Sequence, residues 1–503
     1  MRPPTRPVLW RLGIPIALIV SGIGHARAQD RQTSWYGMYM NGRKIGSMSL
    51  TTEPVTEGGV TRVRLTTVSS VSLTMMGTTI RQDTTAISVC DTALRPLRQE
   101  YTIESGGSTM RLKATFGANA VTCLVEAGGS PSKKTVPIPK GAVLTADSSF
   151  MGVGSAPKIG TRATLYYLNP LTVAIEKAAV KVDAVGKATL GAETYDAYRV
   201  TASTPQGAVV SWQTESGELL WARLPLGMAM YRLTETAAKF PGTPEPSTSE
   251  SLVRDSEVSE DFAAATSIVP DRPIPNPRQA RKLTLEIGGI PDDYQPISDR
   301  WQKVRKAAVS QVGDGKAERV FIFEVATAGR PRTRPKSSSL PADVARYAKA
   351  APYLDQDRPG IRDLAKRLRD ATGNPAMTAS RIRAWIHKNM TPDFGIGVPR
   401  SALDVLKRKR GVCRDYATLF AALARSAGIP TRLAGGIVYG EGRFYYHAWV
   451  ECWLGQWIPY DATLPTDFVD ATHVKFSQGD PTDMMEVARV IGKLSIRVIE
   501  AEP

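Results

Sequence analysis

The most constraining part of this sequence is a segment near its C-terminal end that has the pattern of one helix followed by strands. Apolar residues recur with helical spacing after Cys413, and Gly428 and Pro430 end the pattern. Two runs rich in Val, Ile, Tyr and Trp follow at 431–438 and 444–453, and a third, shorter run covers 457–461. The segment therefore predicts a mixed α+β unit with Cys413 at the first turn of its helix.

Three residues of this unit have the chemistry of a nucleophilic site. A free thiol has a pKa of about 8.5, so a nucleophilic cysteine needs an imidazolium or a helix N-terminus to hold it as a thiolate. Cys413 is expected at a helix start, His447 lies in the second strand, and Asp461 ends the third. Strand alternation puts His447 and Trp449 on one face and Cys452 on the other. The pattern predicts Cys413 as nucleophile, His447 as its base and Asp461 as the carboxylate that orients His447.

Taken singly, each residue also has a structural interpretation, as a buried thiol, a hydrogen-bonded strand histidine or a turn-capping aspartate. Together, the segments GVCRDYA, LARSAGIPTR, HAWVE and WIPYDAT resemble the core of the transglutaminase-like superfamily, a papain-like thiol fold. The lead-in SALDVL and the later DATH, residues 470–473, are similar to it too. The resemblance covers about residues 340–500 and implies that Cys413, His447 and Asp461 form a catalytic triad.

The resemblance leaves the reaction open. Such a triad can form an acyl-enzyme from a glutamine carboxamide or a peptide bond and pass it to water or to an amine. No run of calcium ligands accompanies the core and water is always available, so we expect a hydrolase, a cysteine peptidase or amidase, with a protein or peptide substrate. A protein-glutamine amine transferase that cross-links its substrates is the second hypothesis. A non-catalytic envelope binding or scaffold protein is the third.

The first 28 residues have the pattern of a secretory signal peptide. Arginines at positions 2, 6 and 11 precede an apolar run over 12–23, and Ala26-Arg27-Ala28 gives a cleavage signal. A retained N-terminal anchor is the alternative, although the apolar run is shorter than the roughly 20 residues that a membrane span needs. We expect an exported protein of the periplasm or cell envelope, with no transmembrane helix in the mature chain.

The net charge of the chain bears on its partners. The formal charge is +16, and removal of four arginines with the signal peptide leaves +12. In an exported protein this predicts contact with an anionic envelope component and not with nucleic acid. The basic run 407–410 is expected to be a solvated helix end whose positive field acts near Cys413. With four histidines and no CxxC or HExxH motif, we expect neither a metal nor a cofactor.

The rest of the chain predicts three further parts. Residues 29–240 carry short alternating runs and an Asn41-Gly42 hairpin turn, which predict an antiparallel β domain, a half-open barrel or sandwich-like. Residues 241–280 are expected to be a linker, 281–335 a small β module, and 336–503 the transglutaminase-like α+β domain.

Four more side chains carry expectations of their own. Cys90 and Cys123 are candidates for a disulfide in an oxidising compartment. His387 is expected to serve as a positive charge at a helix end, and His473 to have a surface or structural role.

Overall fold

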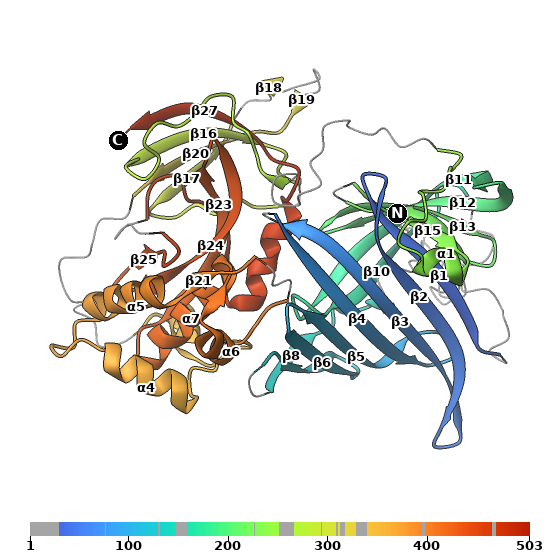
Figure 1. Cartoon of the computed structure of the whole chain (residues 1–503), viewed down its shortest axis with the longest axis horizontal. Coiled ribbons are helices and arrows are strands. Elements are labelled where there is room, and N and C mark those ends of the chain that lie inside the picture. Colours follow the sequence, from blue (N-terminus) through green and yellow to red (C-terminus); the bar gives the residue numbers. More distant parts are fainter. Residues whose placement is uncertain are drawn as a thin grey trace, which may run out of the picture.

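The computed structural model describes most of the chain. The described residues are 30–75, 77–128, 131–146, 158–225, 227–250, 266–292, 294–307, 310–311, 317–327, 340–394, 398–464 and 469–502. The predicted signal peptide, residues 1–28, and residues 251–265 of the predicted linker lie outside them. No helix among the described residues is long and apolar enough to cross a membrane. The fold class is α+β, as predicted, with two sheet regions before a helix-bearing C-terminal part (Figure 1).

The N-terminal region is one 15-stranded sheet that curves strongly. Its strands are β1 (Gln32–Met40), β2 (Arg43–Glu57), β3 (Val60–Met75), β4 (Thr78–Cys90), β5 (Pro96–Ser105), β6 (Ser108–Phe116), β7 (Ala120–Glu126), β8 (Ser132–Pro137), β9 (Val143–Leu144), β10 (Arg162–Asn169), β11 (Ala174–Leu190), β12 (Glu193–Thr204), β13 (Gly207–Thr214), β14 (Leu219–Arg223) and β15 (Met228–Leu233). Strands β1 to β8 and β10 to β15 form two antiparallel meanders, and β1 pairs with β15 to join them. The short helix α1 (Glu235–Lys239) follows and packs on β1 and β2.

Local sequence explains the strands and their turns. Every second residue of β6 from Ser108 to Ala114 is buried, so one face of the sheet is apolar. The predicted Asn41-Gly42 turn joins β1 to β2 with φ values of 50° and 85°, the left-handed region that two-residue hairpin turns need. Cys90 and Cys123 are both buried and free. The disulfide that the sequence left open is therefore not formed, because β5 and β6 separate the two strands that carry these residues.

A small four-stranded sheet follows, and the C-terminal strand completes it. Its order is β17 (Gln302–Lys306), β20 (Phe321–Ala326), β16 (Lys282–Gly288) and β27 (Ser495–Glu502). Two short strands, β18 (Ser310–Gln311) and β19 (Ala317–Glu318), pair beside it. Residues 495–502, which the prediction placed in the C-terminal domain, thus pair with the small module. Phe323 of this sheet packs on Phe476 of the next, with ring centroids 5.6 Å apart.

The C-terminal part packs helices against a second four-stranded sheet, β25 (Trp457–Tyr460), β24 (Arg443–Trp453), β23 (Thr431–Gly440) and β26 (Val474–Gly479). The helices are α3 (Ala342–Ala345), the 3-10 turn η2 (Arg346–Ala348), α4 (Pro359–Leu368), α5 (Pro375–Asn389), α6 (Ala402–Arg408), α7 (Cys413–Ser426) and the 3-10 helix η3 (Pro481–Arg489). A short parallel bridge links β21 (Thr391–Pro392) to β22 (Arg410–Gly411). Helix α7 is buried from Asp415 to Arg425 and packs on β24.

The N-terminal sheet touches the C-terminal part close to the start of α7. Hydrogen bonds between described residues cross this boundary: the Ser401 N–H donates to the Ala127 carbonyl at 2.9 Å, the Arg408 guanidinium to the Gly107 carbonyl at 2.9 Å, and the Lys134 ammonium to the Thr482 hydroxyl at 3.1 Å. Tyr353 and Val398 extend the apolar cluster of β5 to β8 across the same boundary. The segment that leads into Cys413 is therefore supported by the N-terminal sheet.

Candidate active site

Cys413 is the first residue of α7, as predicted. The Asp415 carboxylate accepts the Val412 backbone N–H at 3.0 Å and so caps the helix start. Arg400, which is as deeply buried as Asp415, donates to the same carboxylate oxygen at 3.1 Å. A side chain at position 411 would lie 2.5 Å from Asp415 and 2.6 Å from Arg400, so only glycine fits there. This packing fixes the backbone immediately before the thiol.

His447 and Asp461 are brought together by neighbouring strands. His447 lies in β24 and Asp461 directly follows β25, and His447 Nε2 is 2.8 Å from Asp461 Oδ2. The other carboxylate oxygen accepts the backbone N–H of Thr463 at 2.7 Å and its hydroxyl at 2.6 Å. The ring of Trp449 stacks beside His447, with centroids 6.2 Å apart, so both lie on the predicted face of β24. Asp461 thereby holds one edge of the imidazole in a fixed orientation.

The electrostatic partners of the Cys413 thiol are the His447 side chain, the backbone of Ala448 and Arg414. Burial alone would raise the pKa of Cys413, but His447, with smaller contributions from Ala448 and Arg414, lowers it below its ordinary value. Burial opposes the charged form of His447, but Asp461 and the Cys413 sulfur raise its pKa to about 10. The arrangement can therefore hold a thiolate beside an imidazolium, the state in which a cysteine attacks carbonyl carbon.

His473 belongs to this cluster, which the sequence did not predict. Its side chain is buried, and its Nε2 is 3.2 Å from Asp461 Oδ2. Its Nδ1 lies 3.3 Å from the Asp470 carboxylate, which in turn accepts from Arg278 at 2.7 Å. Burial would raise the pKa of Asp461, but His447 and His473 together hold it well below 3.8. The sequence feature that could have identified His473 is the segment DATH, which places it just before the strand that pairs with β23.

The other residues singled out in the sequence lie outside this cluster. Cys452 is buried on the far face of β24, 3.5 Å from the Thr431 hydroxyl, and burial raises its pKa to about 12. His387 is in the last turn of α5, as predicted, and its Nδ1 is 3.2 Å from the Ala462 carbonyl. In the basic run 407–410, Arg408 pairs with Asp404 and Arg410 with Asp393. The positive charges that lower the pKa of Cys413 instead come from His447 and Arg414.

The two histidines and Asp461 also offer a set of metal-ligand atoms. One such atom from each of His447, Asp461 and His473 lies within 4.8 Å of the other two. The Asp461 oxygen that faces both rings already binds them at 2.8 and 3.2 Å. A cation placed there would have to replace the hydrogen bonds that orient His447, so the cluster fits an orienting role better than a metal site.

Comparison with known families agrees with this geometry. Residues 362–462 match the model of the transglutaminase-like superfamily. The chain contains a transglutaminase-like domain. The match supports a cysteine-based enzyme. Residues 35–234, most of the N-terminal sheet, match a family of proteins of unknown function, DUF3108.

Three curated relatives share part of the chain. An uncharacterized protein of Mycobacterium leprae (strain TN) is 39% identical over 111 residues, which cover 20% of this chain and 38% of that protein. An uncharacterized protein of Haemophilus influenzae is 37% identical over 116 residues, or 22% of this chain and 30% of that protein. A protein-glutamine gamma-glutamyltransferase of Pseudomonas aeruginosa is 28% identical over 151 residues, which cover 26% of this chain and 20% of that protein. The chain thus spans well under half the length of these relatives.

Solved structures give weaker similarities. A candidate cysteine protease from Cytophaga hutchinsonii has a TM-score of 0.31 and 19% identity, covering 43% of this chain and 86% of that one. A β-barrel-like protein of the family DUF1849 from Brucella abortus has a TM-score of 0.27 and 8% identity, covering 40% of this chain and 94% of that one.

Proposed function

We propose that this protein is an exported, thiol-dependent hydrolase that cleaves amide or peptide bonds in the cell envelope. The observation that carries the proposal is the place of Cys413 at the start of α7, with His447 as its main electrostatic partner and the Nε2 of His447 held by Asp461 at 2.8 Å. In this proposal Cys413 is the nucleophile, His447 the general acid and base, and Asp461 the orienting carboxylate. The signal-peptide pattern of residues 1–28 supports export.

The reaction follows from these positions. The Cys413 thiolate attacks the carbonyl carbon, and the C–N bond breaks while His447 gives its proton to the leaving amine. His447 then takes a proton from water, which attacks the acyl-enzyme and releases a carboxylic acid and the free thiol. The backbone N–H of Cys413, at the positive end of α7, is the candidate donor to the oxyanion.

Transfer to an amine is the second candidate reaction. One relative is named as a protein-glutamine gamma-glutamyltransferase, and the acyl-enzyme is common to both reactions. The two differ only in whether water or a lysine amine takes the acyl group. The scaffold hypothesis remains the third, and it requires no reactivity at Cys413.

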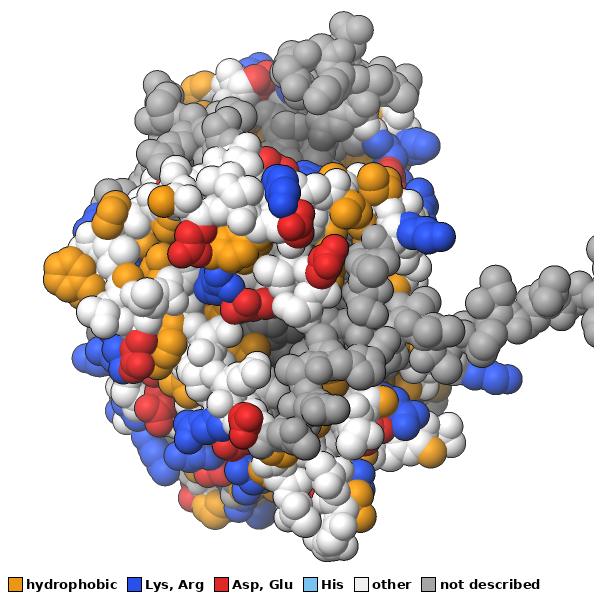
Figure 2. All heavy atoms as spheres, turned by 90° about the vertical axis from the view of Figure 1, so that its right-hand side faces the viewer, with side chains coloured by type: hydrophobic (Ala, Val, Ile, Leu, Met, Phe, Trp, Pro, Cys, Tyr) orange, Lys and Arg blue, Asp and Glu red, His pale blue; other side chains and the backbone are white. Residues whose placement is uncertain are grey.

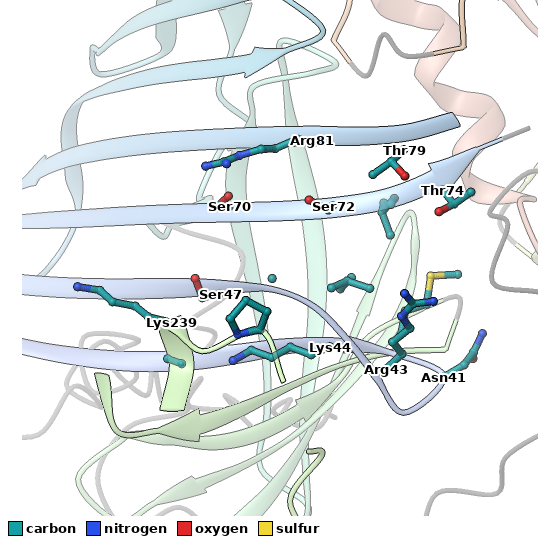
Figure 3. A pocket seen from close by; sticks show the side chains of 16 residues that line it. Asn41, Arg43, Lys44, Ser47, Ser70, Ser72, Thr74, Thr79, Arg81 and Lys239 are labelled. Carbon is teal, nitrogen blue, oxygen red and sulfur yellow. The ribbon is translucent and has the colours of Figure 1, made fainter. Parts of the chain in front are cut away.

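An anionic envelope component is a proposed partner, and a groove on the N-terminal sheet supports it. The groove measures about 560 Å³, and Figure 3 shows Arg43, Lys44, Arg81 and Lys239 around it. No acidic side chain is among its described lining residues, although Arg81 pairs with Asp83 and Lys239 with Glu235 beside it. On the face drawn in Figure 2, basic and acidic side chains of the described residues are interspersed. Binding of the purified protein to anionic vesicles should weaken with salt and with Lys44→Glu, and equal binding by the variant would contradict this assignment.

One assay separates the three functions. The mature protein is incubated with a glutamine-containing peptide and a labelled primary amine, and ammonia release, peptide cleavage and amine incorporation are measured together. Release or cleavage that exceeds incorporation supports the hydrolase, whereas incorporation that exceeds both supports the transferase. Cys413→Ala must abolish all three signals, and the matched control Cys452→Ala must retain them, because the Cys452 side chain faces away from His447. If Cys413 of the wild-type protein is unreactive in all three measurements, only the scaffold hypothesis remains.

A further inference from the structure

A second pocket lies inside the curve of the N-terminal sheet, and its walls are mainly apolar. Its volume is about 310 Å³, which lies at the lower end of the range of about 300–1,000 Å³ for small-molecule sites. It separates two apolar clusters, one around Tyr167 and Val200, the other around Met48 and Met230. Val209 packs against both clusters. The pocket is therefore a gap in an otherwise continuous apolar layer.

The side chains that line this gap suit a flexible, slender ligand. Three methionines, Met38, Met48 and Met230, contribute to the wall. Methionine is unbranched and adapts to the shape of an apolar ligand. At one end Tyr167 donates to the Glu176 carboxylate at 2.9 Å, and Gln206 donates to the same oxygen at 2.9 Å. That end of the pocket already has its polar groups paired.

Gln213 lines the same pocket and has a buried polar atom that is unpaired. Its side chain is only 4% exposed, and its amide nitrogen donates to the Ser211 hydroxyl at 3.0 Å. The amide oxygen of Gln213 has no hydrogen-bond partner. A buried polar atom without a partner destabilises a fold, so a ligand that supplies the partner gains affinity. If the Gln213 amide has the opposite orientation, its nitrogen is the unpaired atom instead of its oxygen. A ligand hydroxyl can both donate and accept a hydrogen bond, so it can pair with the amide in either orientation.

The rim of the pocket lies beside the C-terminal part of the chain. A side chain at Gly207, next to Gln206, would lie 2.9 Å from Pro225, another lining residue. It would also lie 3.8 Å from the side chain of Lys493, which follows η3. A ligand with its chain in the pocket would thus bring a carboxylate or similar head group near a lysine.

We propose that this pocket binds one acyl chain that carries a hydroxyl group. The chain lies against Met38, Met48 and Met230, and the hydroxyl pairs with the Gln213 amide. The acidic end of the acyl group, as a free acid or as part of a lipid, emerges at the rim beside Lys493. Neither the site at Cys413 nor the anionic groove supplies any of these contacts.

The first test uses the full mature chain and calorimetric titration with hydroxylaurate and laurate. Hydroxylaurate should bind about tenfold more tightly, because laurate leaves the Gln213 amide unpaired. In Gln213→Leu, which keeps the side-chain size and removes the amide, the two ligands should bind equally. Absence of binding by either ligand, or an unchanged preference in Gln213→Leu, would overturn the proposal.

A second variant tests the location. Val209→Trp should fill the gap between the two clusters and abolish binding, while the matched control Leu124→Trp, on a 43% exposed position of β7, should bind as the wild type does. Retained binding by Val209→Trp, with a melting curve that shows it folded, contradicts the assignment. If Val209→Trp does not fold, the preference measured in Gln213→Leu decides. A lysophospholipid carrying the same chain separates the two sources: tighter binding than the free acid indicates a lipid, and weaker binding a free acid.

Discussion

The carboxylate of Asp461 and the carboxamide of Gln213 are both buried, but their surroundings are opposite. Both oxygens of Asp461 are engaged, one by His447 and His473 and the other by Thr463. The oxygen of Gln213, in the N-terminal sheet, has no partner. A saturated group holds its neighbours in a single geometry, which is what a catalytic base requires. An unsaturated group beside an empty volume instead has capacity left for a ligand. The contrast separates the proposed catalytic site from the proposed binding pocket.

The largest expected effect comes from Asp461→Asn, which would break the saturated side of this contrast. An amide cannot stabilise the His447 imidazolium and holds the wrong tautomer, so kcat should fall by about 10⁴-fold, the loss known for the equivalent change in a serine-protease triad. Peptide or amide cleavage measured under saturating substrate gives the value. Thr463→Val is the control; it removes a hydroxyl that donates to the other Asp461 oxygen and lies 3.3 Å from His447 Nε2, and it should lose far less. Equal losses in the two variants would contradict the orienting role of Asp461.

The next largest effect is on stability at the start of α7. Arg400 and Asp415 are 2% and 1% exposed, and removal of one partner of a buried pair costs about 3–5 kcal/mol because the other charge is left unpaired. Arg400→Met should therefore lower the free energy of unfolding by that amount, measured in a urea titration. Arg410→Met removes a pair with Asp393 whose arginine is 64% exposed and should change it by less than about 1 kcal/mol. Similar values for the two variants would show that burial does not decide the energetics here.

Much of the site could be predicted because its signals are local. The helix that begins at Cys413, the strand of His447 and the strand before Asp461 follow from residue spacing within about fifty positions. The role of His473 could not, because its contact with Asp461 forms only when β26 pairs with β23. The same holds for Arg278, which reaches Asp470 from the far side of the small β module.

The order of the strands was also beyond the sequence. Alternation predicted a β-rich N-terminal domain, but the pairing of β1 with β15 joins residues about 190 positions apart and depends on how the whole sheet curves. Strand order also decides that Cys90 and Cys123, whose pairing the sequence left open, are both free. For the same reason, the sequence did not predict that the last strand, β27, pairs with β16 in the small sheet.

The pH dependence of alkylation sharpens the contrast between two thiols. The pKa of Cys413 is held below 9.0 and that of Cys452 is raised to about 12. At pH 6, Cys413 should react with iodoacetamide at least about 100-fold faster, because the thiolate fraction sets the rate. In His447→Ala, burial is no longer opposed by the imidazolium, so the midpoint of Cys413 labelling must move to higher pH. If the pH midpoint of Cys413 labelling does not move, Cys413 and His447 do not form an ion pair.

The same pair also makes stability depend on pH. The folded-state pKa of His447, about 10, lies above its ordinary value of 6.5. Its protonation therefore stabilises the fold fully below pH 6.5, and this contribution is lost as the pH rises through 10. In His447→Ala, the melting temperature should fall less steeply over that alkaline range than it does in the wild type. If it falls as steeply, other groups cause the alkaline loss of stability.

A smaller effect is expected for His473→Asn, which tests whether Asp461 needs its second imidazole. One hydrogen bond to a charged group is worth about 1.5 kcal/mol, so kcat should fall about tenfold with KM unchanged. Burial opposes the charge of His473, but Asp461 and Asp470 raise its pKa. Loss of this partner of Asp461 should move the alkaline limb of the pH profile, which is set by His447. A lower melting temperature with an unmoved limb would make His473 purely structural.

The smallest expected effect is the stability change in Gln213→Leu, on the unsaturated side of the contrast. The variant loses the hydrogen bond to Ser211, worth about 1 kcal/mol, but it also removes an amide oxygen that has no partner. These contributions oppose each other, so the free energy of unfolding without ligand should change by less than about 1 kcal/mol. Tyr167→Phe is the comparison, because it removes a donor to the buried Glu176 carboxylate and should cost about 1–3 kcal/mol. A loss in Gln213→Leu as large as that in Tyr167→Phe would mean that Gln213 is held by the fold and is not reserved for a ligand.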